Sequence, residues 1–239
     1  MYQFFNETKI NDIFIITDKD YHHIKNVIKL KVNENVIIVF KEKKYLCKII
    51  EFNNSECIVK IIDEIISNAS NININLFLGV IREQKWDYAL QKSTEIGVSN
   101  IYPVIFKRNV VKINNKDEEK KLIRWQSIVN NAAKQAKVLN IPNVKSVIYN
   151  VNDIIKQKSS LNLLCYENEE GTTLKNVLKG ELNCKNINLI IGPEGGLDES
   201  EVIKLNNNGF KSVSLGNNIL RAETAPLFAL SCIKYEFDM

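Results

Sequence analysis

The C-terminal two thirds of the sequence alternate between short, continuously apolar runs and longer amphipathic segments. Leu76–Ile81 and Ile101–Phe106 are apolar runs of strand length, whereas Glu83–Ile96 has helical periodicity and is followed by Gly97, a typical helix C-cap residue. The remaining predicted strands are Val144–Tyr149, Leu161–Tyr166, Ile187–Ile191 and Ser212–Leu215, and the remaining helices are Asp117–Leu139, Val151–Lys158, Thr172–Leu178, Glu199–Asn207 and Thr224–Phe237. This alternation predicts an α/β domain with a parallel sheet covered on both faces, where ligands bind beyond the carboxyl ends of the strands.

The N-terminal part follows a different pattern, in which short β-branched runs are separated by polar turns. These runs cover Ile13–Ile16, Val36–Phe40, Tyr45–Ile50 and Cys57–Ile62, and one helix-like insert covers Asp18–Leu30. Their spacing suggests a small barrel or curled sheet, an architecture often used to hold nucleic acid or sugar. The polar stretch Ser67–Asn71 then predicts a linker to the α/β domain.

Glycine is scarce in this chain of 239 residues, yet five of the nine glycines fall between residues 192 and 216. Three of them lie in residues 192–196 after an apolar strand, and Asp198 with Glu201 then has the spacing of a helix capping box. Gly216 follows the next predicted strand and precedes an Arg-x-Glu-Thr motif at residues 221–224. Each turn alone would be read as a tight βα connection. Their joint occurrence favours a pocket in which backbone N–H groups contact a ligand.

Several ligand chemistries are excluded by what these motifs lack. The first strand of the α/β part is followed by Arg82-Glu83-Gln84-Lys85, so the glycine-rich fingerprint of a dinucleotide site is absent. No Gly-Lys-Ser/Thr follows either glycine cluster, which excludes a P-loop. The only histidines, His22 and His23, lie in the N-terminal part, which argues against a metal site and against a His-dependent hydrolase. A net charge of +4 does not by itself indicate a nucleic-acid partner.

The location of the protein is indicated by its cysteines and its apolar runs. Five scattered cysteines without a C-x-x-C pair predict reduced, mostly buried thiols. No apolar run approaches the roughly 18 residues that span a bilayer, and the N-terminus lacks the basic-then-apolar pattern of a secretory signal. We therefore expect a soluble, cytoplasmic protein without a membrane partner.

Longer motifs follow one another along the chain in a specific order. They are Gln91–Val98 (QKSTEIGV), Lys107-Arg108, Arg124-Trp125 with Ala132–Gln135 and Pro142, Ile191–Gly196 (IGPEGG) and Leu215–Ala225 (LGNNILRAETA). This series, together with His22-His23 and Val27–Lys29, resembles the RsmE family, which consists of SPOUT-superfamily methyltransferases that modify N3 of a uridine in 16S ribosomal RNA. The resemblance covers nearly the whole chain, and the Gly-Pro-Glu-Gly-Gly and Ile-Leu-Arg-x-Glu-Thr motifs are highly specific.

The resemblance implies a two-domain α/β chain. Residues 1–70 would form a PUA-like β-barrel that binds RNA, and residues 71–239 a SPOUT methyltransferase domain with a deep trefoil knot at about residues 187–226. It also implies S-adenosylmethionine as the cofactor, no metal, a homodimer, and 16S ribosomal RNA or the assembled small ribosomal subunit as the partner. The cofactor-binding residues that it implies are Tyr166, Ile191, Gly192, Glu194, Gly195, Gly196, Leu215, Gly216, Asn217, Ile219, Leu220, Arg221 and Thr224.

Methylation of uridine N3 requires an unpaired base, its orientation toward the methyl group, and removal of the N3 proton. Arg221 is the candidate for binding the target base or its phosphate and for stabilising negative charge on the uracil. Glu223 would orient Arg221 or take the proton, while capping of the final helix is an equal alternative. Glu194 is either a turn former or a ligand contact.

Seven basic residues are candidates for RNA contact, and they are Lys25, Lys29, Lys31, Lys107, Arg108, Lys134 and Lys137. The chain departs from the family pattern at Lys29, Lys107, Val138 and Asn218, most of which are positions expected to face RNA.

Two other functions stay open at this point. One is a non-catalytic RNA-binding assembly protein that kept a vestigial knot, and the other is a knotted methyltransferase that acts on a ribose 2′-hydroxyl.

Overall fold

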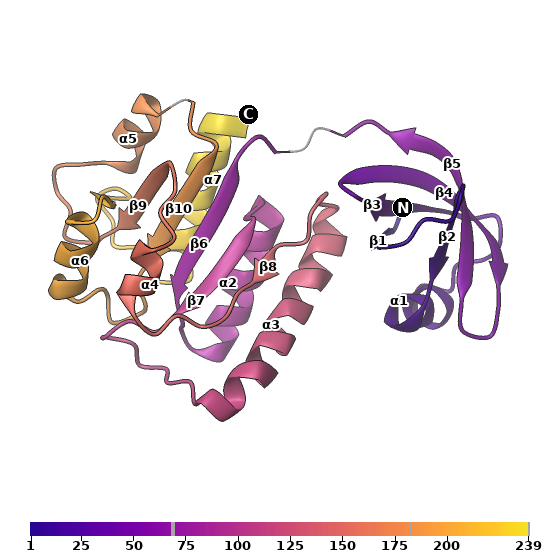
Figure 1. Ribbon diagram of the computed structural model, residues 1–239, viewed down its shortest axis with the longest axis horizontal. Coiled ribbons are helices and arrows are strands. Elements are labelled where there is room, and N and C mark those ends of the chain that lie inside the picture. Colours follow the sequence, from indigo (N-terminus) through magenta and orange to yellow (C-terminus); the bar gives the residue numbers. More distant parts are fainter. Residues whose placement is uncertain (68–69, 182, 239) are drawn as a thin grey trace. The chain divides into compact units, whose positions relative to one another are not determined.

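The chain divides into two compact units, and the computed structural model describes residues 1–67, 70–181 and 183–238 (Figure 1). Unit 1 comprises Met1–Ala69 with Lys134–Asn140, and unit 2 comprises Ser70–Ala133 with Ile141–Met239. Residues 68 and 69 of the expected linker lie outside the described residues. Among the described helices, none combines the length and the apolar composition needed to cross a membrane. Each unit has its own sheet and its own apolar core.

Unit 1 is built on a five-stranded sheet with the order β1-β3-β4-β5-β2. Its elements are β1 (Gln3–Phe5), β2 (Ile13–Ile16), α1 (Asp18–His22), the π-helix η1 (His23–Ile28), β3 (Asn35–Phe40), β4 (Lys43–Phe52) and β5 (Cys57–Ile65). The four predicted strands and the helical insert are confirmed. The sequence did not reveal β1, which has three residues and pairs in parallel with β3.

The sheet of unit 1 curls around an apolar core in which Ile38 and Cys47 are fully buried. An irregularity in the pairing of β4 with β5 falls between Leu46 and Cys47, and such bulges increase strand twist. The two edges of the sheet approach each other, because the side-chain amide of Asn6 donates to the carbonyl oxygen of Ile15 at 2.7 Å. Within residues 1–67 no backbone pairing between β1 and β2 closes the sheet. Unit 1 is therefore a curled half-barrel instead of a closed barrel.

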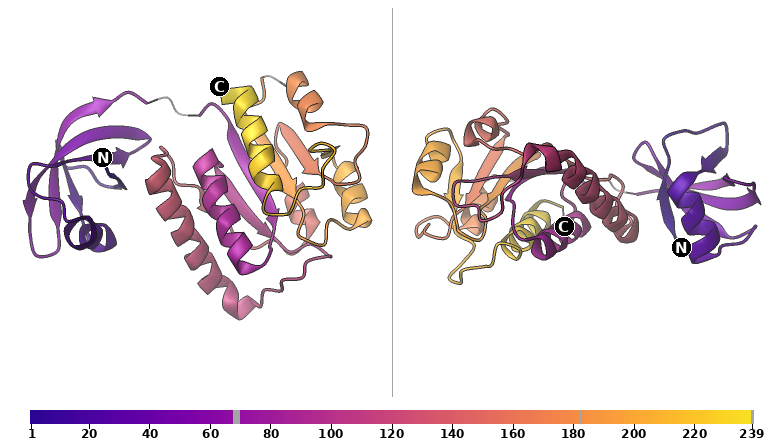
Figure 2. Two further views of the ribbon diagram at one scale, coloured as in Figure 1. Left: turned by 180° about the vertical axis from the view of Figure 1, so that it is seen from behind. Right: turned by 90° about the horizontal axis from the view of Figure 1, so that it is seen from below.

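Unit 2 contains a six-stranded sheet with the order β11-β9-β10-β6-β7-β8, in which every neighbouring pair is parallel (Figure 2). Its strands are β6 (Asn73–Gly79), β7 (Asn100–Val104), β8 (Asn143–Val144), β9 (Leu161–Cys165), β10 (Asn186–Ile191) and β11 (Lys211–Val213). Its helices are α2 (Glu83–Ile96), α3 (Asn115–Ala136), α4 (Val151–Ile155), α5 (Leu174–Gly180), α6 (Glu199–Asn206) and α7 (Ala225–Asp238). The predicted parallel α/β architecture is confirmed.

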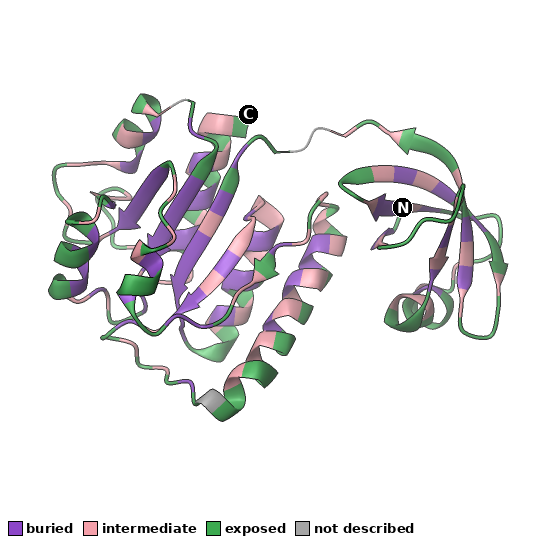
Figure 3. Cartoon of the chain, in the orientation of Figure 1, coloured by how far each residue is buried: buried purple, intermediate pink, exposed green. Residues whose placement is uncertain are grey.

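Helices cover both faces of the sheet in unit 2. Leu76 and Leu78 of β6 belong to the core that α2, α3, α5 and α7 form on one face. Phe77, between them, belongs to the core that α4 and α6 form on the other face. Because both faces are buried, the strands are mainly apolar beyond their amino ends. Figure 3 accordingly shows the central strands as buried along most of their length.

Some predicted elements are shorter in the structure. β8 covers two residues instead of Val144–Tyr149, because the chain leaves the sheet edge after Val144 and meets β7 again only at one bridge, between Ile148 and Val104. α3 ends at Ala136 instead of Leu139, because Lys137 has a left-handed φ of 54°, which a right-handed helix cannot continue.

A row of asparagines crosses the sheet of unit 2 toward the amino ends of its strands. The row consists of Asn162, Asn188, Asn75 and Asn100, which face one another in register on β9, β10, β6 and β7. Bonds of 2.9 Å join each side-chain amide to the next, from Asn188 to Asn162, from Asn75 to Asn188 and from Asn100 to Asn75. A shift of one residue in these pairings would bury the amides without partners, so the row specifies the register of the sheet.

We expect Asn188→Ala to lower the free energy of unfolding by about 2–4 kcal/mol, measured by urea denaturation. Asn188 is fully buried, and its amide also donates to the carbonyl oxygen of Gln157 at 2.6 Å, so the substitution leaves several buried groups unpaired. The matched control is Asn186→Ala on the same strand, because Asn186 is exposed and its side-chain oxygen accepts one long bond, of 3.4 Å, from the Asn73 amide. The control should change the stability by less than about 0.5 kcal/mol. Equal losses in the two variants would contradict the role of the asparagine row.

Candidate functional site

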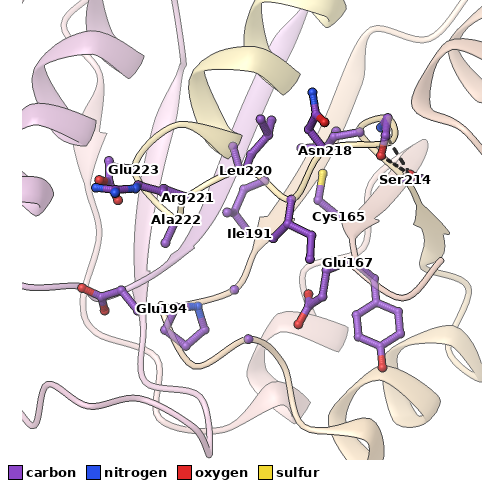
Figure 4. A pocket seen from close by; sticks show the side chains of 18 of the residues that line it. Cys165, Glu167, Ile191, Glu194, Ser214, Asn218, Leu220, Arg221, Ala222 and Glu223 are labelled. Atoms are coloured by element: carbon purple, nitrogen blue, oxygen red, sulfur yellow. Dashed lines mark hydrogen bonds between the residues drawn. The ribbon is translucent and has the colours of Figure 1, made fainter.

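A cavity of about 410 Å³ opens at the carboxyl ends of β9, β10 and β11 (Figure 4). Its wall consists of the segments that follow these strands, namely residues 165–167, 191–194 with 196, and 214–223, together with Lys85 of α2 and Ala225 of α7. Segments far apart in the sequence converge here because parallel strands end at one edge of the sheet. This is the edge at which open α/β sheets bind ligands.

The first glycine turn is shaped by close contact between backbones. A Cβ on Gly79, the last residue of β6, would lie 2.5 Å from the nitrogen of Pro193 and 2.9 Å from the carbonyl carbon of Gly192. Only glycine therefore lets the turn pack against the end of β6. Gly196 has a left-handed φ of 70° and donates its N–H to the Pro193 carbonyl at 2.9 Å. The capping box predicted from Asp198 follows at the start of α6.

The structure gathers most of the predicted cofactor-binding residues around this cavity. Those that line it are Tyr166, Ile191, Gly192, Glu194, Gly196, Leu215, Gly216, Asn217, Ile219, Leu220 and Arg221. Gly195 and Thr224 lie outside the lining. A Cβ on Gly195 would lie 2.5 Å from the carbonyl oxygen of Arg108, so this glycine allows two loops to pack together. Thr224 donates its N–H to the Arg221 carbonyl at 2.8 Å, in the turn that leads into α7.

Sequence reasoning missed several residues of the lining, namely Lys85, Cys165, Glu167, Pro193, Ser214, Asn218, Ala222 and Ala225. Pro193, Asn218, Ala222 and Ala225 lie within the two glycine motifs, and the other missed loop residues adjoin predicted ones, so taking each loop as a whole would have found them. Lys85 is different, because it belongs to the first turn of α2 and no nearby motif marks it. It reaches the cavity because α2 packs against α7.

The two candidate catalytic residues have different surroundings. The Glu223 side chain is 14% exposed, and its Oε1 lies 3.3 Å from Nζ of Lys85, while its Oε2 is buried without a hydrogen-bond partner. Arg221 is exposed, and its guanidinium has no ion pair or hydrogen bond among the residues that the structure describes. Within the described part of the chain Glu223 forms an ion pair with Lys85 and none with Arg221, so it does not orient Arg221 by an ion pair, one of the roles considered for it.

Glu194 and Cys165 contribute side chains of different character to the cavity. Glu194 lines it and also accepts the N–H of Arg82 through Oε1 at 3.3 Å, so both roles considered for it are compatible with its position. Burial raises the pKa of the Cys165 thiol above its usual value. At neutral pH this thiol is therefore protonated and is a poor nucleophile.

Lys107 and Arg108, two of the RNA-contact candidates, are tied to the start of α6. Nζ of Lys107 and Nε of Arg108 each lie 3.6 Å from an oxygen of the Asp198 carboxylate, and Lys107 also donates to the Ser200 hydroxyl at 2.6 Å. The hydrogen bond from Ser200 holds the pKa of Asp198 below its usual value, and the two cations act in the same direction. Both basic side chains remain at least half exposed.

The other candidates for RNA contact lie in two segments. Lys25, Lys29 and Lys31 follow one another from η1 toward β3, and Nζ of Lys25 lies 5.1 Å from the centre of the Tyr21 ring. Lys29 ends η1 with a left-handed φ of 59°. Lys134 and Lys137 lie in the last turn of α3 and directly after it.

Known proteins that are similar to this chain include RNA methyltransferases. A family model of the RNA methyltransferase domain matches residues 68–234, and a model of the RNA methyltransferase PUA domain matches residues 16–62. The chain is 36% identical to ribosomal RNA small subunit methyltransferase E of Mesomycoplasma hyopneumoniae (strain 232), over 98% of this chain and all of that protein. It is 28% identical to the protein of the same name from Bacillus subtilis (strain 168), over 95% of this chain and 91% of that one.

A solved structure extends this similarity to three dimensions. It is a ribosomal RNA small subunit methyltransferase E from Neisseria gonorrhoeae, bound to S-adenosylmethionine. The two structures superpose with a TM-score of 0.89 at 28% identity, over 99% of this chain and 98% of the other. The similarity therefore includes both units and the loops that form the cavity.

We expect Gly79→Ala to destabilise the protein by about 2 kcal/mol or more, because the new methyl group pushes the Gly192-Pro193 turn away from β6. Thermal unfolding measures the effect as a lower Tm. Gly180→Ala is the control, since a Cβ there meets no atom within 4 Å and the residue ends α5, where alanine is tolerated. If Gly79→Ala were as stable as Gly180→Ala, the close packing of this turn would not be needed.

Proposed function

The chain belongs to the RsmE family, the ribosomal RNA small subunit methyltransferases E, and on this basis we propose that it transfers a methyl group from S-adenosylmethionine to N3 of a uridine in 16S ribosomal RNA. The observation that carries this proposal is the cavity formed by two glycine turns, with the Arg221 guanidinium, which no described residue pairs, at its wall. The N. gonorrhoeae relative, which is similar over nearly its whole length, was solved with S-adenosylmethionine bound.

The lining of the cavity fits this cofactor. Ile191, Leu215 and Leu220 offer apolar contact for an adenine ring, and Gly192 and Gly216 put no side chain between the backbone and the ligand. A Cβ on Gly216 would meet no atom within 4 Å, so the loop after β11 is open at this point. We therefore assign the cofactor to these residues and to the other predicted residues that line the cavity, except Arg221, which we assign to the RNA.

S-adenosylmethionine supplies an electrophilic methyl group on a sulfonium, so the protein has to present the uracil and deal with its N3 proton. Arg221 is free to bind a uracil oxygen or a flanking phosphate, and its charge stabilises the negative charge that develops as N3 loses its proton. We assign the proton to Glu223, which Lys85 holds near Arg221 by an ion pair of 3.3 Å. N3 then carries the methyl group in place of its proton.

We further propose that about residues 187–226 form a deep trefoil knot within a SPOUT domain at residues 71–239. β11 lies at the sheet edge beside β9, whereas α7 packs against α2 and α5. The intervening segment therefore runs past the carboxyl ends of β9 and β10, where it lines the cavity. A segment that crosses back over neighbouring strands in this way is compatible with a knotted chain.

The partners proposed for the protein are RNA and a second copy of the chain. Residues 1–70 would form the PUA-like RNA-binding domain, and the seven basic candidates would contact 16S ribosomal RNA in the cytoplasm. α7 exposes Phe228 and Tyr235, which are seven residues apart and thus share one face of the helix. Exposed aromatic side chains on one helix face favour a homodimer that buries them.

We expect Arg221→Ala to reduce methyl transfer to small-subunit RNA by about 100-fold or more, because the substitution removes the charge that stabilises the uracil anion. Single-turnover transfer assays measure this effect, and calorimetric titration with S-adenosylmethionine should show an affinity close to that of the wild type. Arg221→Lys keeps the positive charge but lacks the planar donors of a guanidinium. Its rate of methyl transfer should lie between those of the wild type and Arg221→Ala. Loss of both activity and cofactor binding in Arg221→Ala would assign Arg221 a structural role.

The position of the methyl group is tested on ribosomal RNA. We expect cells that lack this protein to lose one base-methylated uridine from 16S ribosomal RNA, as detected by mass mapping of nuclease fragments. Re-expression of the wild-type chain should restore it, and re-expression of the Arg221→Ala variant should not. Disappearance of a ribose methyl group alone would overturn the N3 assignment in favour of a 2′-hydroxyl.

A further inference from the structure

Glu167, which follows β9, is a carboxylate in the cavity wall without a partner among the described residues. It lines the cavity and is exposed, and among residues 1–67, 70–181 and 183–238 no donor or cation pairs with it. The other two carboxylates of the wall do have protein partners, since Glu223 pairs with Lys85 and Glu194 accepts the N–H of Arg82. Glu167 is therefore the one acidic side chain of the described wall for which neither carboxylate oxygen has a protein partner.

The position of Glu167 is set by a contact between two loops. A Cβ on Gly196 would overlap Oε1 of Glu167, so the carboxylate of the β9 loop lies directly against the glycine turn that follows β10. Gly196 also requires glycine for its left-handed φ of 70°. The missing side chain at residue 196 thus leaves the space in which the Glu167 carboxylate reaches the cavity.

We propose that the Glu167 carboxylate accepts hydrogen bonds from the ribose hydroxyl groups of S-adenosylmethionine, an inference that rests on the function proposed above. An ionised carboxylate is an acceptor only and can take two donors, which matches the vicinal hydroxyls of a ribose. In another class of nucleotide site, an acidic residue after a parallel strand binds ribose in the same way.

The arrangement of the wall favours ribose over the other donors of the ligand. Figure 4 shows Glu167 and Arg221 on different sides of the cavity, so Glu167 lies away from the end at which the reacting methyl group has to meet the RNA. The apolar side chains of Ile191 and Leu220 suit the adenine ring. The ribose connects the adenine to the reacting end of the cofactor. Its hydroxyl groups therefore need a hydrogen-bond acceptor between these two parts of the cavity, and we assign Glu167 to this place.

Glu167→Gln in the full-length protein tests this proposal by calorimetric titration with S-adenosylhomocysteine and its 2′-deoxy and 3′-deoxy analogues. We expect Kd for S-adenosylhomocysteine to rise about 10- to 100-fold, as for loss of hydrogen bonds to a charged group. Removal of a ribose hydroxyl should weaken binding to the wild type but have little further effect on the variant. S-adenosylmethionine should lose affinity by the same factor, because both ligands carry the ribose. The matched control is Glu170→Gln, an exposed carboxylate of the same loop outside the cavity, which should bind like the wild type.

Three outcomes would overturn the ribose assignment. Equal losses from the deoxy analogues in wild type and variant would show that Glu167 does not contact the hydroxyls. A loss confined to S-adenosylmethionine would show that the carboxylate faces the sulfonium charge. Unchanged affinity in Glu167→Gln would show that it contacts neither. Failure of the proposed function gives a different result, because the wild-type protein itself would then bind neither S-adenosylmethionine nor S-adenosylhomocysteine.

Discussion

The parallel register of the six-stranded sheet in unit 2 is the constraint on which the rest of the site depends. The asparagine row and the two-sided apolar core align the strands, so that β9, β10 and β11 end at the same edge. Short segments after these strands are then enough to enclose a cavity. Gly79 completes the arrangement by letting the turn at Gly192 and Pro193 pack against β6 without a side chain between them. The backbone therefore builds the pocket, and few side chains are left for its chemistry.

The charged side chains around the cavity divide into those that the protein pairs and those that it leaves unpaired. Glu223 is held by Lys85, and Asp198 is held by Ser200, Lys107 and Arg108 at the start of α6. Arg221 and Glu167 have no such partners in the described part of the chain. A charge at a concave surface binds most strongly to a ligand when no protein group competes for it. The unpaired cation suits an electron-rich base or phosphate, and the unpaired carboxylate suits hydroxyl donors.

Local signals in the sequence predicted much of this structure. The bounds of α2, the C-cap at Gly97 and the capping box at Asp198 agree with the structure because each depends on residues a few positions apart. β1 and β8 were predicted poorly, since strands of three and two residues exist only through pairing with distant partners. Lys85 was missed for the same reason, because the packing of α2 on α7 brings it to the cavity.

The sequence by itself determined the parallel α/β class, the two glycine turns and the family, because apolar periodicity and contiguous motifs are local properties of the chain. Only the tertiary structure decided what individual residues do. It turned Gly195 toward Arg108 instead of the cavity, paired Glu223 with Lys85 instead of Arg221, and placed Glu167 against Gly196. Each of these outcomes depends on the distance between residues of different elements, and that distance is set by the packing of strands and helices, which spacing along the sequence does not contain.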